Sequence, residues 1–346
     1  MKIVVDEKIP WILPPLQELA DSVVALPGQS ITRADVIDAD ILIVRTRTRC
    51  DRALLEGTSV RLVVTATIGF DHLDTAYLDE AGIEWHNCPG CNATSVAQYV
   101  HSSLLLLQQE RNIQLAESVF GIVGVGHVGS AVLETACTLG LKRILLCDPP
   151  REACGDTAPR GLEWASYETV LKESDIISFH TPLTHSGPWP TYHLLDGKRL
   201  KALKQRPVVI NTSRGEVVDN QALTEALTDG IIRDAVIDTW ENEPDINRSL
   251  LEKAYIGTPH IAGYSADGKA NATRMSLETV CHFLNRPMTF EIHPPALPES
   301  FRPSADPDTL ALQLYDPRKD SEQLRSAPEM FEYQRGHYPL RRERFT

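Results

Sequence analysis

Short apolar runs that alternate with helical stretches constrain the fold more than any other feature of the sequence. The runs are rich in Val and Ile, and they cover residues 2–7, 39–46, 61–69, 120–126, 142–148, 175–182, 207–215, 234–240 and 255–261. Runs that are apolar throughout are typical of strands buried on both faces. Stretches with helical spacing lie between them, at 96–108, 128–139 and 222–227. This alternation predicts an α/β fold with doubly wound parallel sheets.

The length of the chain and the position of a glycine-rich turn predict two domains. The chain has 346 residues, which is long for one core, and the turn GIVGVGHVG ends only at Gly129. Residues 1–94 are therefore expected to form a separate unit, to which a helix over 266–284 returns the chain. We predict one domain of residues 1–94 and 266–288, a Rossmann domain of residues 95–265, and a small third element over 289–346, where prolines crowd.

Charge and cysteine usage narrow the class of protein. The net charge of −13 argues against nucleic acid or an anionic membrane as a general partner. The seven cysteines are scattered, which fits a reducing compartment. The N-terminus lacks the apolar stretch of a signal peptide, and no segment approaches the roughly 20 apolar residues that span a bilayer. We expect a cytoplasmic protein.

Cys88 and Cys91 form a CPGC pair, which has two interpretations. A metal site would need further ligands nearby, and redox chemistry would need a thioredoxin-like strand and helix. The plainer interpretation is a turn at Pro89 and Gly90 that leads into a helix. We favour the turn and predict no metal site.

The glycines of the turn predict a dinucleotide site. Gly124, Gly126 and Gly129 form GxGxxG between an apolar run and a helical stretch. The first glycine permits the tight turn, the second lets a pyrophosphate approach, and the third lets helix and strand pack closely. Asp148 ends the next run, where an acid can bind ribose hydroxyls and repel a 2′-phosphate. The sequence therefore favours NAD over NADP, with a purely structural glycine turn as the alternative.

Other residues near this turn are weaker cofactor candidates. His127 and Val128 lie inside the turn, and for His127 we favour an exposed or peripheral position. Thr181 ends a run in the same half of the chain, although a Thr-Pro pair is also ordinary loop chemistry.

Three residues that follow apolar runs predict the oxidation of a hydroxy acid. Arg214 in NTSRG can hold a carboxylate with two hydrogen bonds, and Gly215 beside it would let a ligand come close to the backbone. His260 in TPHIAG can take a hydroxyl proton, and Glu243 in DTWENEP can stabilise the imidazolium that forms. Each has a plainer alternative: a surface arginine, a helix-start acid and a structural histidine. Their common position at strand ends, where parallel sheets bind ligands, favours the catalytic interpretation.

These motifs resemble the D-isomer-specific 2-hydroxyacid dehydrogenase family. Longer matches point to members that act on a phosphorylated sugar acid, and they are VDEKIP near the start, VRTRT at 44–48, TATIGFDHLD at 65–74, PGCNA at 89–93, LLCDPPR at 145–151, FHTPLT at 179–184, VVDNQAL at 217–223 and HIAGYSADGKA at 260–270. The resemblance implies oxidation of 4-phospho-D-erythronate to 2-oxo-3-hydroxy-4-phosphobutanoate with NAD, in pyridoxal phosphate (vitamin B6) biosynthesis. It also implies a flavodoxin-like substrate domain, a Rossmann NAD domain and a C-terminal α+β dimerisation element, hence a homodimer.

The resemblance assigns further site residues. It implies that the substrate is held by Thr46, Thr67 and Tyr264. It implies that NAD is held by Asp148, Thr181, Thr212, Ser213, Arg214, Asp238 and Gly263. Arg45, in the same run as Thr46, could meet the phosphate, with Arg47 and an exposed basic edge as alternatives.

The chain also departs from the family pattern. Thr46 stands where a serine is usual, and Asp267 where a glutamate is usual. The C-terminal element ends earlier than is typical, which leaves its completeness open. Two other functions stay open: another D-2-hydroxyacid dehydrogenase, such as one for 3-phosphoglycerate or glyoxylate, and an NAD-sensing corepressor-like protein without catalysis.

Overall fold

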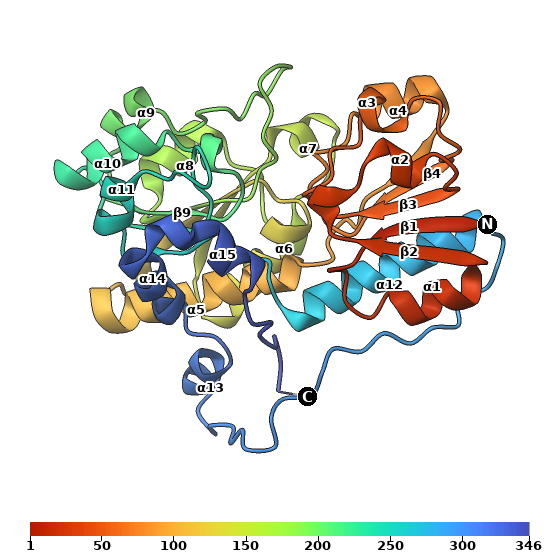
Figure 1. Ribbon diagram of the computed structural model, residues 1–346. Coiled ribbons are helices and arrows are strands. Elements are labelled where there is room, and N and C mark those ends of the chain that lie inside the picture. The colour runs from red at the N-terminus through yellow and green to blue at the C-terminus, as the bar shows by residue number, and fades with distance from the viewer. Residues whose placement is uncertain (346) are drawn as a thin grey trace. The chain divides into compact units, whose positions relative to one another are not determined.

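A computed structural model describes residues 1–345 and divides the chain into two compact units. Unit 1 consists of Met1–Asn92 and Ser265–Ala296, and unit 2 consists of Ala93–Tyr264 and the chain from Leu297 onward. Each unit has its own all-parallel sheet with helices on both faces (Figure 1). The α/β class with two parallel-sheet domains, as predicted from the sequence, is confirmed.

The sheet of unit 1 has five strands in the order β2-β1-β3-β4-β5. The strands are β1 (Lys2–Asp6), β2 (Ser22–Leu26), β3 (Ile41–Val44), β4 (Leu62–Thr65) and β5 (Glu84–His86). Successive side chains of a strand point to opposite faces, so Ile3 and Val5 join one apolar cluster and Val4 joins another. Helices α1 (Leu13–Leu19) and α12 (Ala266–Phe283) cover the first face. The second face is covered by α2 (Arg33–Val36), α3 (Arg52–Leu55) and α4 (Thr75–Ala81).

Two strands of unit 1, β2 and β5, were missed by the sequence analysis, and both lie at sheet edges. The residues of β2 are half-buried or exposed, and its short run SVVAL has no period that separates a strand from a helix. The β5 strand has only three residues, EWH, of which two are exposed. An edge strand has one neighbour instead of two, so it needs no continuous apolar run.

The sheet of unit 2 has six strands in the order β11-β10-β9-β8-β6-β7. They are β6 (Val119–Val123), β7 (Arg143–Cys147), β8 (Ile176–Phe179), β9 (Val208–Asn211), β10 (Asp234–Ile237) and β11 (Ile256–Gly257). Within this sheet β6 comes first along the chain, β7 pairs with one side of it, and β8 pairs with the other side. The strand order therefore reverses between β6 and β8, and in open parallel sheets ligands bind at the carboxyl ends beside such a reversal.

Helices cover both faces of the second sheet. Long helices α5 (Ala93–Arg111) and α6 (His127–Thr138) pack on one face. The other face carries α8 (Tyr167–Glu173), α9 (Gly197–Lys201), α10 (Asn220–Thr228) and α11 (Arg248–Lys253). Helix α7 (Pro149–Ala153) follows β7, and its N-terminus is capped by the side chain of Asp148. Short 3₁₀ turns connect several elements, namely η1 (Gly28–Ser30), η2 (Leu115–Glu117), η3 (Pro159–Gly161), η4 (Gly215–Val217) and η5 (Pro328–Met330).

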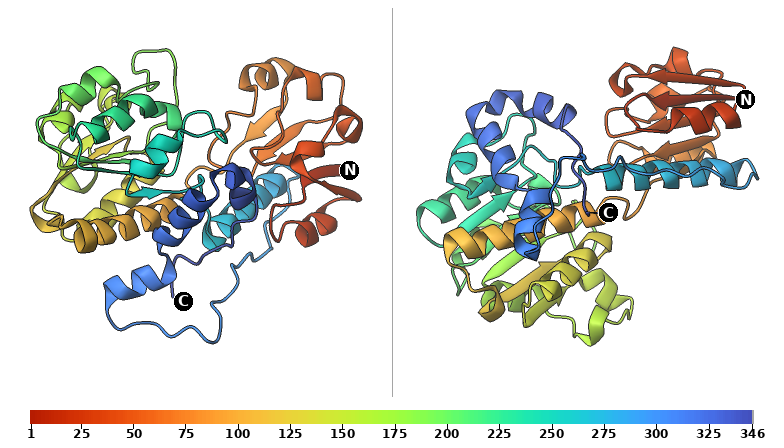
Figure 2. Two further views of the ribbon diagram at one scale, coloured as in Figure 1. Left: turned by 60° about the vertical axis from the view of Figure 1, so that its left-hand side comes forward. Right: turned by 90° about the horizontal axis from the view of Figure 1, so that it is seen from below.

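The C-terminal segment from Leu297 packs with unit 2 and contains helices α13 (Pro307–Leu314), α14 (Pro317–Ser326) and α15 (Phe331–Gly336). Helices α13 and α14, in blue in Figure 2, lie beside α5. Helix α14 covers β11, where the Ser321 hydroxyl accepts a hydrogen bond of 3.0 Å from the Gly257 N–H. The sequence suggested a separate α+β element over 289–346. Within the described residues this stretch forms helices and loops, with no strand longer than a single bridge.

No helix formed by residues 1–345 is both long enough and apolar enough to cross a membrane.

Candidate active site

Three loops at the carboxyl ends of β9, β10 and β11 carry the residues predicted to be catalytic. Arg214 opens the η4 turn after β9, Glu243 lies in the turn after β10, and His260 follows β11. The first two loops touch directly, since a Cβ added to Gly215 would lie 1.9 Å from the Trp240 carbonyl carbon. The second and third are joined by Trp240, whose indole N–H donates to the Thr258 carbonyl at 2.9 Å. The sheet edge therefore assembles all three loops.

His260 and Glu243 form a hydrogen-bonded pair. Nδ1 of His260 lies 2.9 Å from Oε2 and 3.1 Å from Oε1 of Glu243. The carboxylate is fixed in turn by the Trp240 N–H, which donates to Oε1 at 3.0 Å. Among residues 1–345, Nε2 of His260 has no hydrogen-bond partner, and the side chain is 27% exposed. The free nitrogen is therefore the one available for proton transfer.

Electrostatics keep Glu243 ionised. Burial alone would raise the pKa of this carboxyl, but attraction to the His260 ring, its hydrogen bond and the nearby Arg335 together lower the pKa below its usual value. An ionised carboxylate on Nδ1 fixes the ring orientation and stabilises the positive charge that the ring acquires with a proton.

The loop that carries His260 is held by the side chain of Asp238, which follows β10 and is 1% exposed. Its Oδ1 accepts hydrogen bonds from the Thr258 hydroxyl at 2.7 Å and the Ile261 N–H at 2.8 Å, and its Oδ2 accepts one from the Ala262 N–H at 2.9 Å. Tyr99, from α5, lies 2.8 Å from the same threonine hydroxyl. Asp238 is thus an anchor of the loop, and the cofactor contact assigned to it by resemblance stays a prediction.

Arg214 lies in a loop that Asn211 organises. The side-chain amide of Asn211 donates to the Arg214 carbonyl at 2.9 Å, and its oxygen accepts from the Ser213 N–H at 3.1 Å and the Ser213 hydroxyl at 2.8 Å. The sequence suggested that Gly215 lets a ligand approach the backbone. Instead, the absent side chain lets the backbone of Trp240 and Glu241 approach, so this glycine joins two loops.

The glycine turn after β6 has the shape that a pyrophosphate needs. Gly124 has a φ of +85°, and an added Cβ would lie 2.8 Å from the His180 carbonyl. A Cβ on Gly129 would lie 2.0 Å from the Gly124 carbonyl oxygen, so this glycine allows α6 to pack on the turn. A Cβ on Gly126 would meet nothing within 4 Å, which leaves open space before the N-terminus of α6. Helix N–H groups facing such a space bind phosphates.

Asp148 lies at the end of β7 beside this turn. Its Oδ2 accepts a hydrogen bond of 2.7 Å from the Val125 N–H, and its Oδ1 accepts one of 3.2 Å from the Arg151 N–H. Each carboxylate oxygen has a second lone pair for a ribose hydroxyl. The Arg151 guanidinium is engaged with the Val125 carbonyl and Asp156, at 2.7 and 2.8 Å. The arrangement fits NAD better than NADP, which needs a cation for its 2′-phosphate.

The end of β8 closes the other side of the strand reversal. The hydroxyl of Thr181 is buried and has no hydrogen-bond partner among residues 1–345, which is unusual for a buried polar atom and fits a group completed by a ligand. His180 bonds to Ser178 at 2.8 Å and to Thr212 at 3.3 Å, and burial lowers its pKa to about 3. His127 is exposed, and Val128 and Gly263 are half-buried.

The residues assigned to the substrate in unit 1 are less enclosed. Arg45 is paired through Nε with the buried Asp6 at 3.2 Å, while Thr46 and Arg47 are exposed. Thr67 follows β4, and its hydroxyl lies 2.8 Å from both the Thr65 hydroxyl and the Gly69 carbonyl.

Tyr264, the third residue assigned to the substrate, belongs to unit 2. It follows the loop of His260, and its ring packs edge-on against Tyr338 at 6.3 Å between centroids.

The sequence analysis missed Arg335 and Arg341 of the C-terminal segment. Nη1 of Arg335 lies 3.5 Å from Oε2 of Glu243. The buried Arg341 donates to the carbonyls of Ile261, Ala262 and Tyr264 at 3.0, 2.6 and 2.9 Å. For Arg341 the sequence signal was an arginine-rich end, LRRERFT, which resembles an ordinary solvated tail, and Arg335 lies outside that run.

The CPGC pair is a structural turn. Both thiols are buried, and Sγ of Cys88 lies 3.4 Å from the Ala272 carbonyl oxygen and 3.5 Å from the Ser276 hydroxyl of α12. Burial raises the pKa of Cys88 to about 11 and that of Cys91 to about 12, so the thiolate needed for redox chemistry or metal binding is disfavoured. Residues 1–345 contain no group of three His, Cys, Asp or Glu side chains placed to hold a metal ion.

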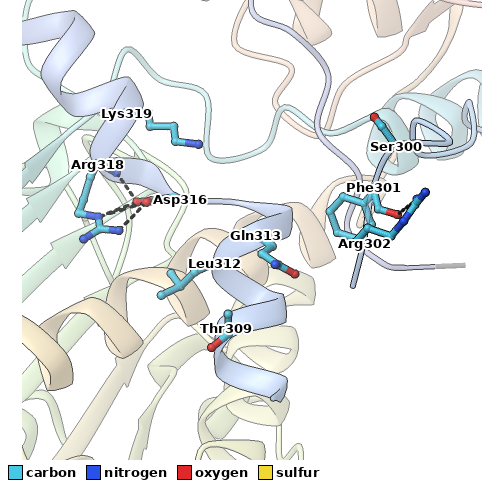
Figure 3. A pocket seen from close by; sticks show the side chains of 9 residues that line it. All are labelled: Ser300, Phe301, Arg302, Thr309, Leu312, Gln313, Asp316, Arg318 and Lys319. Atoms are coloured by element: carbon cyan, nitrogen blue, oxygen red, sulfur yellow. Dashed lines mark hydrogen bonds and ion pairs between the residues drawn. The ribbon is translucent and has the colours of Figure 1, made fainter. Parts of the chain in front are cut away.

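A surface hollow lies in the C-terminal segment, where Figure 3 shows its lining. It is lined by Ser300, Phe301, Arg302, Thr309, Leu312, Gln313, Asp316, Arg318 and Lys319. None of these is a predicted site residue. Arg318 is paired with Asp316 at 2.6 Å and with Glu110 at 2.5 Å, so its charge is balanced within the protein.

Known proteins share this architecture and sequence. The NAD-binding domain of the D-isomer specific 2-hydroxyacid dehydrogenases matches residues 94–262. The erythronate-4-phosphate dehydrogenase of Bacteroides thetaiotaomicron is 54% identical over 343 residues, covering 99% of this chain and 97% of the relative. That of Bacteroides fragilis is 52% identical with the same coverage.

A solved structure agrees with the sequence relatives. The D-lactate dehydrogenase of Aquifex aeolicus, solved with NAD and lactic acid, is 25% identical with a TM-score of 0.69, and the match covers 82% of this chain and 96% of that one. The predicted NAD cofactor and the predicted family are both confirmed. The chain belongs to the D-isomer specific 2-hydroxyacid dehydrogenase family, in the group whose members are named erythronate-4-phosphate dehydrogenase.

Proposed function

We propose that this chain oxidises 4-phospho-D-erythronate to 2-oxo-3-hydroxy-4-phosphobutanoate with NAD, a step of pyridoxal phosphate (vitamin B6) biosynthesis. The observation that carries the proposal is the His260–Glu243 pair, 2.9 Å apart, at the strand ends of a Rossmann sheet. The full-length similarity to relatives named erythronate-4-phosphate dehydrogenase supports the choice of substrate.

The roles of the three loop residues follow from their chemistry. His260 accepts the proton of the substrate hydroxyl at Nε2, and Glu243 on Nδ1 stabilises the resulting imidazolium. Arg214 holds the substrate carboxylate with its planar fork, which fixes the reacting carbon in one orientation. When bound, NAD supplies the hydride acceptor that no side chain can provide.

The cofactor is assigned to the strand reversal of unit 2. The glycine turn and the N-terminus of α6 would face its pyrophosphate, with His127 and Val128 at the edge of this contact. Asp148 would bind the adenosine ribose, and the unpartnered Thr181 hydroxyl would gain a partner. Thr212, Ser213, Arg214, Asp238 and Gly263 are assigned by family resemblance.

The substrate phosphate is assigned to the loop after β3. A terminal phosphate needs cations and hydroxyl donors, and Arg45, Thr46 and Arg47 supply both. Nε of Arg45 is engaged by Asp6 at 3.2 Å, which orients the guanidinium, and we assign the phosphate to Arg45 with Arg47 as the alternative. Thr67 and Tyr264 complete the set by resemblance.

A substrate panel tests the proposal. Purified protein with NAD should form NADH from 4-phospho-D-erythronate with a kcat/KM at least about ten times that for 3-phosphoglycerate or glyoxylate. Comparable rates on 3-phosphoglycerate would replace the assignment by another D-2-hydroxyacid dehydrogenase. Binding of NAD without turnover of any hydroxy acid would favour an NAD sensor.

We further propose a homodimer in the cytoplasm. Several large apolar side chains of the C-terminal segment are exposed, among them Met330 at 40%, Tyr333 at 56% and Phe345 at 48%, and α13 has no buried residue. In a dimer, a second copy of the chain would cover these side chains. All seven cysteines are free, as expected in a reducing compartment. Light scattering should give twice the mass of one chain, and a monomer at micromolar concentration would contradict the dimer.

A further inference from the structure

The C-terminal segment is built into the base of the active site. Helix α14 covers β11, whose continuation carries His260. The Arg325 guanidinium donates to the carbonyls of Leu251, Ala254 and Tyr255 at 3.1, 2.5 and 3.0 Å. Leu324 and Phe331 are fully buried in the core of unit 2. Such contacts fix the segment on the sheet edge.

Arg341 then fastens the loop that follows His260. Besides the carbonyls of Ile261, Ala262 and Tyr264, its guanidinium donates to the Ser95 carbonyl at 3.2 Å and to Oε1 of Gln98 at 2.9 Å. The same group stacks on Tyr315, 3.9 Å from the ring centroid. A guanidinium has five N–H donors, and here they join the carbonyls of this loop to two acceptors on α5.

Arg335, on α15, brings a positive charge to the His260–Glu243 pair. Its side chain is 14% exposed, Glu243 is 17% exposed, and Nη1 lies 3.5 Å from Oε2, the oxygen that also faces His260 Nδ1. Tyr264 hydrogen-bonds to the same guanidinium, and Oε1 of Glu332 lies 4.0 Å from Nη1. The carboxylate is thus shared between the imidazole of His260 and the guanidinium of Arg335.

We propose that Arg335 is a positioning residue of the active site, which balances the charge of Glu243 and so keeps His260 readily deprotonated. The inference rests on the proposed function, in which His260 must be neutral to accept the substrate proton. A carboxylate alone would favour the imidazolium strongly and weaken His260 as a base. The guanidinium competes for Oε2 and repels a proton on the ring, and both effects favour neutral His260.

Other charged groups surround the His260–Glu243 pair, and they are the same residues in every variant of the test. Asp238 interacts electrostatically with His260, and Glu332 and Tyr264 interact with Arg335. Glu241, in the same turn as Glu243, is paired with His193 at 2.6 Å, and Arg214 opens the loop after β9. A change caused by Arg335 alone is therefore attributable to its charge.

The experiment measures the pH profile of kcat/KM for the oxidation direction. In Arg335→Gln the acid limb, where activity is lost as His260 gains a proton, should move to higher pH by roughly 0.5–1 unit. Arg335→Lys keeps the charge and should restore most of the wild-type limb. Arg325→Gln is the matched control, because it loosens the same segment without touching Glu243, and its limb should stay in place.

A second measurement needs no substrate. Histidine ring signals followed by NMR, with His260 assigned by comparison with His260→Gln, should show a higher titration midpoint for His260 in Arg335→Gln than in wild type. Arg335→Met carries the same test if the Gln variant does not fold, as judged by thermal unfolding. An unmoved midpoint, or an equal movement in Arg325→Gln, would overturn the proposal. Failure of the proposed function would instead appear as wild-type protein that does not oxidise 4-phospho-D-erythronate.

Discussion

The loops after β11 and after β3 carry the two halves of the proposed chemistry, and they are built differently. In the loop after β11, His260 is held by Glu243 at 2.9 Å, and the neighbouring N–H groups are held by the buried Asp238. In the loop after β3, Arg45 is paired with Asp6 at 3.2 Å, while Thr46 and Arg47 are exposed. In the first loop the reacting side chain is held by a partly buried carboxylate, and in the second loop two of the assigned side chains are exposed to solvent.

The difference follows from what each loop must do. A group that transfers a proton gains from being fixed before the substrate arrives, because misplacement by about 1 Å can cost roughly 100-fold in rate. A group that only recognises a phosphate can remain solvated until the phosphate replaces water. Variants of the first loop should therefore change kcat, and variants of the second should change KM.

The largest effect is expected at His260. Replacing His260 by Ala removes the proton acceptor, so kcat should fall by roughly 100-fold or more. The affinity for NAD, measured by calorimetry, should change little, because this ring is not needed to bind the cofactor. A kcat close to that of the wild type would mean that His260 is not the proton acceptor and that the loop after β11 does not supply the proton-transfer group.

A smaller loss is expected for Arg214→Lys. Lysine keeps the charge but not the planar fork, so KM should rise and kcat should fall, with kcat/KM lower by about 10- to 100-fold. Steady-state kinetics on 4-phospho-D-erythronate would measure both parameters. Wild-type kinetics in this variant would mean that the carboxylate is held elsewhere.

Thr46 provides the matching test of the open loop. Thr46→Ala removes a hydroxyl donor, and KM for the phosphorylated substrate should rise by roughly 3- to 10-fold with kcat nearly unchanged. Thr46→Ser keeps the hydroxyl and serves as the control, with KM near the wild-type value. A fall in kcat without a change in KM would contradict the assignment of phosphate recognition to the loop after β3.

The smallest effect concerns stability and pH. Because the folded-state pKa of Glu243 lies below its ordinary value, its carboxylate stabilises the fold above the unfolded-state pKa of about 4.3. This contribution is lost as the pH falls through the lower, folded-state pKa. In Glu243→Gln this titrating carboxylate is absent. The free energy of unfolding, measured with urea across this pH range, should therefore vary less with pH than in the wild type, and the difference should be less than about 1 kcal/mol. Identical pH dependence in both proteins would show that the pair contributes nothing to stability.

Much of the fold and part of the site were predictable from local sequence. The apolar runs located the buried strands, since strands covered on both faces have to be apolar throughout. The edge strands β2 and β5 were missed because an edge has no such requirement. GxGxxG located the turn after β6, because only glycine fits the positive φ at Gly124 and the contact between Gly129 and the Gly124 carbonyl.

The same local signals misjudged Gly215 and were silent on the C-terminal segment. Gly215 lies beside Arg214 in sequence, which suggested a ligand contact, yet the space it leaves is filled by the Trp240 backbone. Nothing in the order of residues indicates which backbone will arrive there, because that depends on how β9 and β10 pair in the sheet.

The sequence by itself determined the fold class and the glycine turn, and it selected Arg214, Glu243 and His260 as the catalytic candidates, because these depend on periodicity and on residue types in short motifs. Only the tertiary structure decided how His260 is held. Glu243 lies 17 residues from it along the chain, and Arg335 lies 92 residues from Glu243, yet the three side chains meet. Contacts of this kind arise when β10, β11 and the C-terminal helices pack together, and no local pattern in the chain encodes that packing.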